Sequence, residues 1–165
     1  MVHRLATEKD IDAVYDLYMV GSSNIYLTYD PMNKVEFETI YAGVLKSNTL
    51  YVVEKDNHVI ATYRLIPKTD RQAHTIYLGG FSIRQELQGK GLGSQILSDI
   101  KTTAFLRGKT RIELTVDIHN SAAIGVYKKM GFIIEGHIRR SYRRSDTNAF
   151  YDEYLMGLIM GDENN

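Results

Sequence analysis

A glycine-rich turn between an apolar strand pattern and an amphipathic helix pattern constrains this chain more than any other feature. The turn reads Gln-Gly-Lys-Gly-Leu-Gly-Ser over residues 88–94. Residues 75–83 before it read as an apolar strand, and residues 94–107 after it repeat apolar side chains at helical spacing. Glycines let the backbone turn tightly and direct successive N–H groups outward at the positive end of the helix dipole. The sequence therefore predicts a pyrophosphate-binding loop.

Two common phosphate-binding loops do not fit the spacing of this turn. The Walker A loop requires Gly-Lys-Ser/Thr, whereas Lys90 is followed by Gly91. The dinucleotide fingerprint requires a third glycine or alanine three residues after the second, where this chain has Ile96. The spacing Gln88-x-x-Gly91-x-Gly93 resembles instead the acetyl-CoA pyrophosphate loop of the GNAT superfamily of N-acetyltransferases.

A second segment carries the same resemblance. Residues 111–116 alternate as a strand and are followed by Asn120-x-x-Ala123-x-x-x-Tyr127-Lys-Lys-Met-Gly131-Phe132, which is similar to the other conserved string of that superfamily. In the family this Asn and Tyr face the pantetheine arm of the cofactor. A polar hairpin is expected at Glu135-Gly136, and residues 151–156 resemble the closing strand of amino-acid and polyamine N-acetyltransferases. The resemblance covers nearly the whole chain.

The remaining pattern predicts an α/β fold. A capping-box pattern at Thr7 opens a first helix, and Asn33 to Lys46 form a second. Further strands are expected at residues 2–5, 49–54 and 58–66. The resemblance implies a GNAT-like mixed, mostly antiparallel twisted sheet, with central splayed parallel strands and helices on both faces. We expect one N-acetyltransferase domain over residues 1–160 and a frayed C-terminus over residues 161–165.

Composition limits the classes of function. Twenty basic residues balance twenty acidic ones, so neither a nucleic-acid partner nor a membrane partner is indicated. No apolar run is long enough to span a membrane and no signal peptide is evident, so we expect a cytoplasmic protein; a homodimer is left open. The absence of cysteine excludes disulfides, thiolate zinc sites and a cysteinyl acyl-enzyme, and no metal is expected.

The resemblance implies acetyl-CoA as co-substrate and assigns its contacts. Pantetheine would pair like an added strand with the backbone of Phe81, Ser82 and Ile83. The pyrophosphate would lie on the turn formed by Gln88, Gly89, Lys90, Gly91, Leu92, Gly93 and Ser94. Asn120 would contact the cofactor and is also a favoured N-cap residue. Tyr127 is the predicted proton donor to the departing thiolate; the alternative is a buried residue of a short helix.

The general base is where the chain departs from the family. Many relatives carry a Glu in the cofactor strand or near the end of the next strand. The first stretch has no carboxylate, with Tyr77 near the expected place, and Thr115 stands at the second. Glu113 lies on the same face as Thr115 and is the best carboxylate candidate. His119 and His74 are further candidates, although a single His next to a loop is more often exposed to solvent. The alternatives are an ion pair for Glu113, and loss of the amine's proton along a chain of water molecules.

Substrate recognition is expected from the loop over residues 21–30 and from the last strands. An acidic pair, Asp152 and Glu153, would suit a cationic amine, whereas arginines would suit an amino-acid carboxylate. We therefore expect an acetyltransferase that acts directly on a small primary amine, an amino acid ahead of a polyamine. A protein N-terminal acetyltransferase and a non-catalytic acyl-CoA-sensing module are the alternatives. The candidate substrate-binding residues are Asn24, Tyr26, Tyr29, Arg64, Tyr142 and Tyr151.

Overall fold

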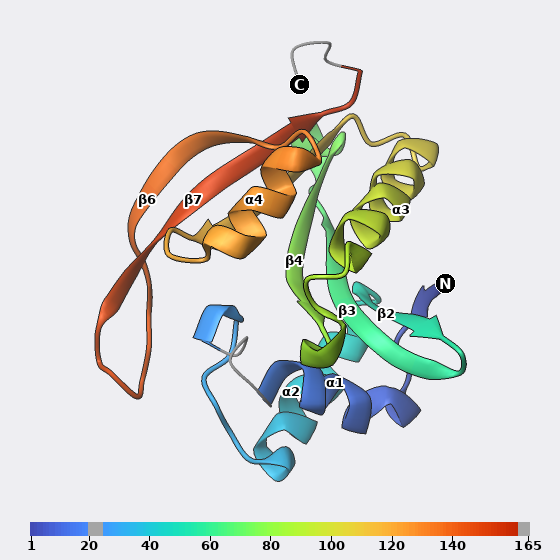
Figure 1. The fold of residues 1–165 in the computed structure, drawn as a ribbon, viewed down its shortest axis with the longest axis vertical. Coiled ribbons are helices and arrows are strands. Elements are labelled where there is room, and N and C mark those ends of the chain that lie inside the picture. The colour runs from blue at the N-terminus through green and yellow to red at the C-terminus, as the bar shows by residue number, and fades with distance from the viewer. Residues whose placement is uncertain (20–24, 162–165) are drawn as a thin grey trace. The chain divides into compact units, whose positions relative to one another are not determined.

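The computed structural model describes residues 1–19 and 25–161 of the 165-residue chain (Figure 1). Within these residues seven strands form one sheet in the order β1-β2-β3-β4-β5-β7-β6. The strands are β1 (Val2–Leu5), β2 (Leu50–Lys55), β3 (His58–Pro67), β4 (Thr75–Ile83), β5 (Arg111–Asp117), β6 (Ile133–Arg143) and β7 (Phe150–Ile159). The helices are α1 (Ile11–Met19), α2 (Lys34–Lys46), α3 (Leu92–Leu106) and α4 (Ser121–Lys129), with short 3-10 turns η1 (Glu8–Asp10), η3 (Asp70–Gln72) and η4 (Gln85–Leu87).

The predicted α/β class with a mixed, mostly antiparallel sheet is confirmed. The parallel pair is β4 with β5, and its register joins Thr75 to Arg111 and Tyr77 to Glu113. Four further pairs are antiparallel: β1 with β2, β2 with β3, β5 with β7 and β6 with β7. No helix in the described part of the chain is both long and apolar enough to cross a membrane.

The internal contacts divide the chain into two compact units. The first unit consists of residues 1–65 and 79–88, and the second of residues 66–78 and 89–165. In the first unit, α1 and α2 supply aromatic and aliphatic side chains that bury the face of β2 carrying Leu50 and Val52. Its buried cluster consists of Val14, Tyr18, Phe37, Tyr41, Leu50 and Val52.

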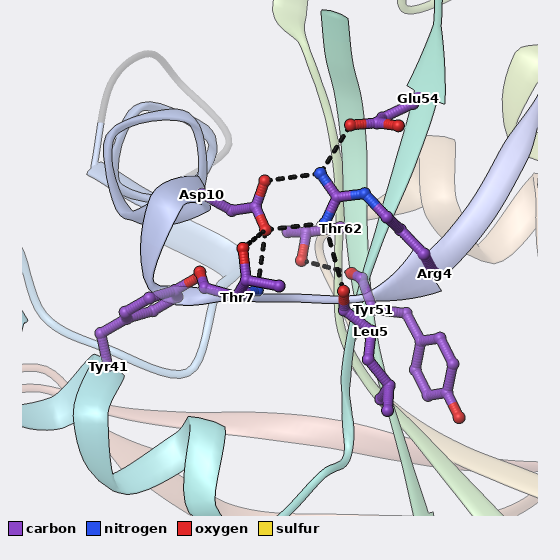
Figure 2. Close-up of polar contacts among 8 residues, drawn as sticks. All are labelled: Arg4, Leu5, Thr7, Asp10, Tyr41, Tyr51, Glu54 and Thr62. Atoms are coloured by element: carbon purple, nitrogen blue, oxygen red, sulfur yellow. Dashed lines mark hydrogen bonds and ion pairs between the residues drawn. The ribbon is translucent and has the colours of Figure 1, made fainter. Parts of the chain in front are cut away.

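A buried acid organises the entry to α1 in the first unit (Figure 2). The Arg4 guanidinium on β1 donates to both Asp10 oxygens, at 2.8 and 2.7 Å, and also to Glu54 on β2. The backbone N–H of Thr7 donates to Asp10 at 2.7 Å, as the sequence predicts for a capping box. The hydrogen bonds from Arg4 hold the pKa of the Asp10 carboxyl well below its usual range. The Arg4 guanidinium on β1 therefore joins this strand to η1 and to β2.

The second unit is built around α3. Its predicted apolar face is confirmed, because Ile96, Leu97, Ile100 and Ala104 are the buried residues of the helix. The buried residues on strands of this unit include Ile112, Leu114 and Met156.

One expectation for the second unit is wrong. No turn occurs at Glu135-Gly136: β6 runs through it with a register shift between Ile134 and Gly136, and the long β6–β7 hairpin turns after Arg143 (Figure 1). The shift lets the antiparallel ladder with β7 continue on both sides of the two residues. The chain reverses farther on, where Arg144 N–H donates to the Ala149 carbonyl at 3.1 Å.

Candidate active site

The glycine-rich turn enters α3 with the backbone geometry that its sequence predicts. Gly89 and Gly91 have left-handed φ angles of 73° and 79°, and Gly91 is the N-cap residue of α3. A Cβ built on either glycine meets no atom of the described residues within 4 Å. Backbone conformation, and not close packing against protein, therefore explains why these positions are glycine.

The N-terminus of α3 has no side-chain cap among the described residues. The helix begins at Leu92, earlier than the predicted Ser94, because Gly91 already takes the left-handed conformation before the first turn. Its first turn contains no acidic residue. The first N–H groups of this fifteen-residue helix therefore have no side-chain acceptor among the described residues. Together with the positive end of the helix dipole they can bind an anion.

The end of β4 lies in the first unit and is fixed by side-chain hydrogen bonds. The buried Ser82 hydroxyl donates to the carbonyl of Leu17 on α1 at 2.9 Å. The Gln88 amide donates to the carbonyl of Ile83, also at 2.9 Å, which ties the start of the glycine turn to β4. The side chain of Ser82 is therefore engaged by protein, so any contact of this residue with a cofactor would come from its main chain.

Asn120 caps α4 in the second unit. Its Oδ1 accepts a hydrogen bond from the backbone N–H of Ala123 at 3.2 Å, so the predicted N-cap role is confirmed. An asparagine side chain also carries two N–H donors, and none of these has a partner among the described residues. The amide nitrogen thus remains available to a ligand while the oxygen holds the start of the helix.

Tyr127 is the buried residue of α4. Its ring packs edge-on against Phe132, with centroids 5.7 Å apart, and 8% of the residue is exposed. No other residue in the described ranges makes a hydrogen bond with its hydroxyl. Burial raises the pKa of the Tyr127 phenol, and the neighbouring Tyr77 adds to the rise. The side chain is therefore a neutral hydroxyl donor without an acceptor among the described residues.

Tyr77 and Thr115 meet across the parallel pair of strands. The Tyr77 hydroxyl lies 2.9 Å from Thr115 Oγ1, and either oxygen can be the donor. Tyr77 and Thr115 are the residues that the family resemblance placed at or near the expected positions of a carboxylate. Two hydroxyls, in contact with each other, therefore stand on β4 and β5.

Glu113 is engaged by two cations. It is buried on β5, where Lys68 Nζ contacts its Oε1, and Arg111 Nε lies 3.4 Å from its Oε2. Arg111 also makes a bidentate pair with Glu135 on β6. Both Glu113 oxygens are thus compensated, which favours the ion-pair interpretation of this residue over a role as proton acceptor.

The candidate substrate residues of the first unit do not share one environment. Tyr26 is exposed, whereas Tyr29 is half-buried and packs against Tyr18, with centroids 6.1 Å apart. Arg64 lies half-buried on β3 and donates to the hydroxyl of Thr49. Asn24 lies outside the described residues. Arg64 is thus the candidate of this unit that presents a charge.

In the second unit, Tyr151 stacks on Tyr142, with centroids 5.3 Å apart and the ring planes 15° from parallel. The Tyr142 hydroxyl donates to the buried carboxylate of Asp117 at the end of β5. Burial raises the pKa of Tyr142, and its bond to Asp117 adds to the effect. The stack is therefore anchored by a buried acid.

Sequence reasoning did not select Asp117 or Tyr18 as site residues. Asp117 accepts from the His119 backbone N–H at 2.7 Å as well as from Tyr142. Tyr18 donates to the carbonyl of Gly80, where β4 takes a left-handed φ of 56°. A glycine inside an apolar strand is the signal that was present for the second contact. Asp117 had no local signal, because its partner lies twenty-five residues away.

The described residues hold no group of three or more His, Cys, Asp or Glu side chains arranged for a metal ion. The model of the acetyltransferase (GNAT) family matches residues 11–132, which include the glycine turn, Asn120, Tyr127 and Phe132. The chain belongs to the GNAT family. It is an N-acetyltransferase, and acetyl-CoA is the acetyl donor that this family uses.

Relatives of this GNAT acetyltransferase differ in the acceptor that their names give. S-(2-succino)cysteine N-acetyltransferase of Bacillus subtilis is 24% identical over 87% of this chain and 84% of its own. Spermidine N-acetyltransferase from Vibrio cholerae, solved with CoA and spermine, has a TM-score of 0.81 at 22% identity, covering 99% of this chain and 98% of its own. Ribosomal-protein-alanine N-acetyltransferase from Brucella melitensis has a TM-score of 0.78 at 18% identity, covering 97% and 100%. The two solved structures establish the fold alone.

Proposed function

We propose that this GNAT acetyltransferase transfers the acetyl group of acetyl-CoA directly to the primary amine of a small molecule, an amino acid ahead of a polyamine. The uncapped entry to α3, with left-handed Gly89 and Gly91, carries the cofactor half of the proposal. It supplies N–H donors and a helix dipole to a pyrophosphate. The relative named for a cysteine derivative supports an amino-acid acceptor.

In the proposed reaction the neutral acceptor amine attacks the thioester carbonyl. A free alkylamine has a pKa of about 10, so it must lose a proton before attack. We assign this proton to water, because Glu113 is compensated by Lys68 and Arg111. The main chain of Phe81, Ser82 and Ile83 is the proposed partner of the pantetheine amides.

Tyr127 is the proposed donor to the departing sulfur. A thiol has a pKa of about 8.5, far below that of a buried phenol. Tyr127 therefore keeps its proton and stabilises the developing thiolate by a hydrogen bond. The proton that the sulfur of CoA takes up comes from water, which received one from the amine. Its hydroxyl, unpaired with any described residue, is suited to that role.

A polyamine acceptor is the second candidate, and one arrangement favours it. Asp117 and Glu153 are register partners on β5 and β7, and among the described residues neither has a basic partner. The stacked Tyr142 and Tyr151 stand beside them. Carboxylates next to aromatic rings suit an alkylammonium group.

The test is CoA release with matched acceptor panels: free amino acids, polyamines, and peptides with a free N-terminal alanine. Turnover with amino acids above the other two panels supports the proposal. Preference for polyamines would transfer it to the second candidate, and preference for peptides to a protein N-terminal acetyltransferase. Tight acetyl-CoA binding by calorimetry without turnover on any acceptor would support the cofactor-sensing module instead.

A further inference from the structure

Arg64 differs from Arg4 and Arg111, two other partly buried arginines, in what it binds. Arg4 pairs with Asp10 and Glu54, and Arg111 pairs with Glu135. The half-buried guanidinium of Arg64 donates through Nε and Nη2 to one neutral oxygen, Thr49 Oγ1, at 3.2 and 3.1 Å. No carboxylate of the described residues lies within ion-pair distance of it. A full positive charge is thus held partly out of water without a counter-charge from the described residues.

A chain of hydroxyls fixes the direction of this guanidinium. Thr49 Oγ1 accepts from Arg64 and lies 2.6 Å from Ser47 Oγ. Ser47 Oγ in turn donates to the carbonyl of Val44 in the last turn of α2, at 2.6 Å. Since Ser47 gives its proton to Val44, Thr49 gives its proton to Ser47 and keeps its lone pairs for Arg64. Thr49 is buried, so the anchor is rigid.

The aliphatic arm of Arg64 lies beside β4. A Cβ built on Gly80 would come 3.9 Å from Arg64 Cδ and 2.5 Å from the Tyr18 hydroxyl. Gly80 immediately precedes Phe81, the first residue of the segment proposed to bind pantetheine. Burial raises the pKa of Tyr18, so its phenol stays neutral and does not compensate Arg64. The charge therefore stands next to the proposed cofactor strand.

We propose that Arg64, oriented by Thr49, binds the α-carboxylate of an amino-acid acceptor, and so selects amino acids over the corresponding amines that lack the carboxylate. The inference rests on the proposed acetyl transfer to a small amine. With Nε and Nη2 occupied, Nη1 and the second proton of Nη2 remain to meet two carboxylate oxygens. A guanidinium that lacks an internal acid gains its counter-charge from the substrate, which favours binding.

The first measurement uses the unaltered protein and compares each L-amino acid with the amine formed by removing its carboxylate. We expect kcat/KM to favour the amino acid by about tenfold or more, the range for a charge-assisted hydrogen bond. Equal kcat/KM for both members of every pair would overturn the assignment while leaving the proposed function intact. No turnover with either member would count against the proposed function itself.

Variants then locate the effect. Arg64→Gln should raise KM for amino acids by about tenfold or more and leave the decarboxylated amines unchanged, so that the preference disappears. Arg64→Lys keeps the charge without the planar fork and should restore part of the preference. Arg71→Gln removes the same charge from an exposed position on η3 and should behave as wild type.

Thr49→Val tests the positioning. It leaves the guanidinium charged but removes its acceptor, so amino-acid KM should rise less than in Arg64→Gln, with kcat almost unchanged. Acetyl-CoA affinity and the melting temperature serve as checks on the fold. If Arg64→Gln does not fold, two measurements still test whether Arg64 binds the carboxylate. These are the kinetics of Arg64→Lys and the wild-type comparison of amino acids with their decarboxylated amines. An Arg64→Gln protein that folds and keeps the full amino-acid preference would refute the proposal.

Discussion

At the scale of single residues, Tyr127 and Glu113 have separable roles. Tyr127 has a buried ring and a hydroxyl with no acceptor among the described residues. Glu113 has both oxygens compensated by cations. The first arrangement leaves a group available to a ligand, and the second occupies a group that resembled a catalytic base in sequence.

Tyr127→Phe should lower kcat by roughly 10²-fold and leave the dissociation constant of acetyl-CoA almost unchanged. The substitution removes the hydroxyl alone, and the ring contact with Phe132 is kept. Steady-state kinetics at saturating acceptor measure kcat, and calorimetry measures the dissociation constant of acetyl-CoA. Wild-type turnover in the variant would assign Tyr127 to core packing only.

Glu113→Gln should leave the pH dependence of kcat/KM unchanged, with the rate following the pKa of each acceptor amine. Water accepts the amine's proton in this mechanism, so acceptors of different basicity should shift the profile. The variant should also be less stable by about 1–3 kcal/mol, because Lys68 loses its partner. A pH limb that disappears in a folded Glu113→Gln protein would establish Glu113 as the base.

Among the elements, the turn before α3 has a left-handed backbone conformation that its proposed role in pyrophosphate binding requires. Gly91 is required by its φ of 79°, since no described atom lies within 4 Å of a Cβ built there. Gly43 inside α2 is equally open but does not have a positive φ. Neither position is crowded, so a comparison of substitutions at Gly91 and Gly43 tests the effect of the positive φ alone.

Gly91→Val should weaken acetyl-CoA binding by at least about tenfold, because a branched side chain is strained at that φ and stands where the pyrophosphate is proposed to lie. Gly43→Ala is the matched control and should raise stability by about 0.5–1 kcal/mol with unchanged cofactor affinity. Calorimetry and thermal unfolding give both quantities. Unchanged affinity in Gly91→Val would remove the pyrophosphate from this turn.

At the scale of the whole molecule, the ion cluster of Figure 2 links stability to pH. Asp10 has a folded-state pKa below its usual value, caused first by its bonds from Arg4. A carboxyl with a depressed pKa stabilises the fold fully above its unfolded pKa of about 3.9, and the contribution is lost as pH falls towards the folded pKa. The cluster should therefore stabilise the folded protein at neutral pH and lose this stabilising effect in acid.

Asp10→Asn should reduce the free energy of unfolding at pH 7 by about 2 kcal/mol, since Arg4 and the Thr7 N–H lose a charged acceptor. The difference between variant and wild type should shrink as pH falls below about 4. Urea unfolding at a series of pH values measures both. A difference that stays constant down to acidic pH would show that the carboxylate charge is not responsible.

The sequence alone is enough to predict the family, the glycine turn, the apolar face of α3 and the N-cap role of Asn120. These features are local: spacing, helical period and capping depend on residues a few positions apart. It misplaced the hairpin at Glu135-Gly136, because a register shift in a continuing strand and a turn look alike in a short window.

The partners of the charged groups became evident only in the three-dimensional fold. Glu113 forms an ion pair with Lys68, the residue that follows β3. Arg64 donates to the hydroxyl of Thr49, which does not neutralise its charge as a carboxylate would. Asp117 acquires its role from Tyr142, twenty-five residues away. A charge gains or lacks a partner through long-range contacts, and its energy depends on burial and on the neighbouring charge. No spacing rule along the chain encodes those two quantities.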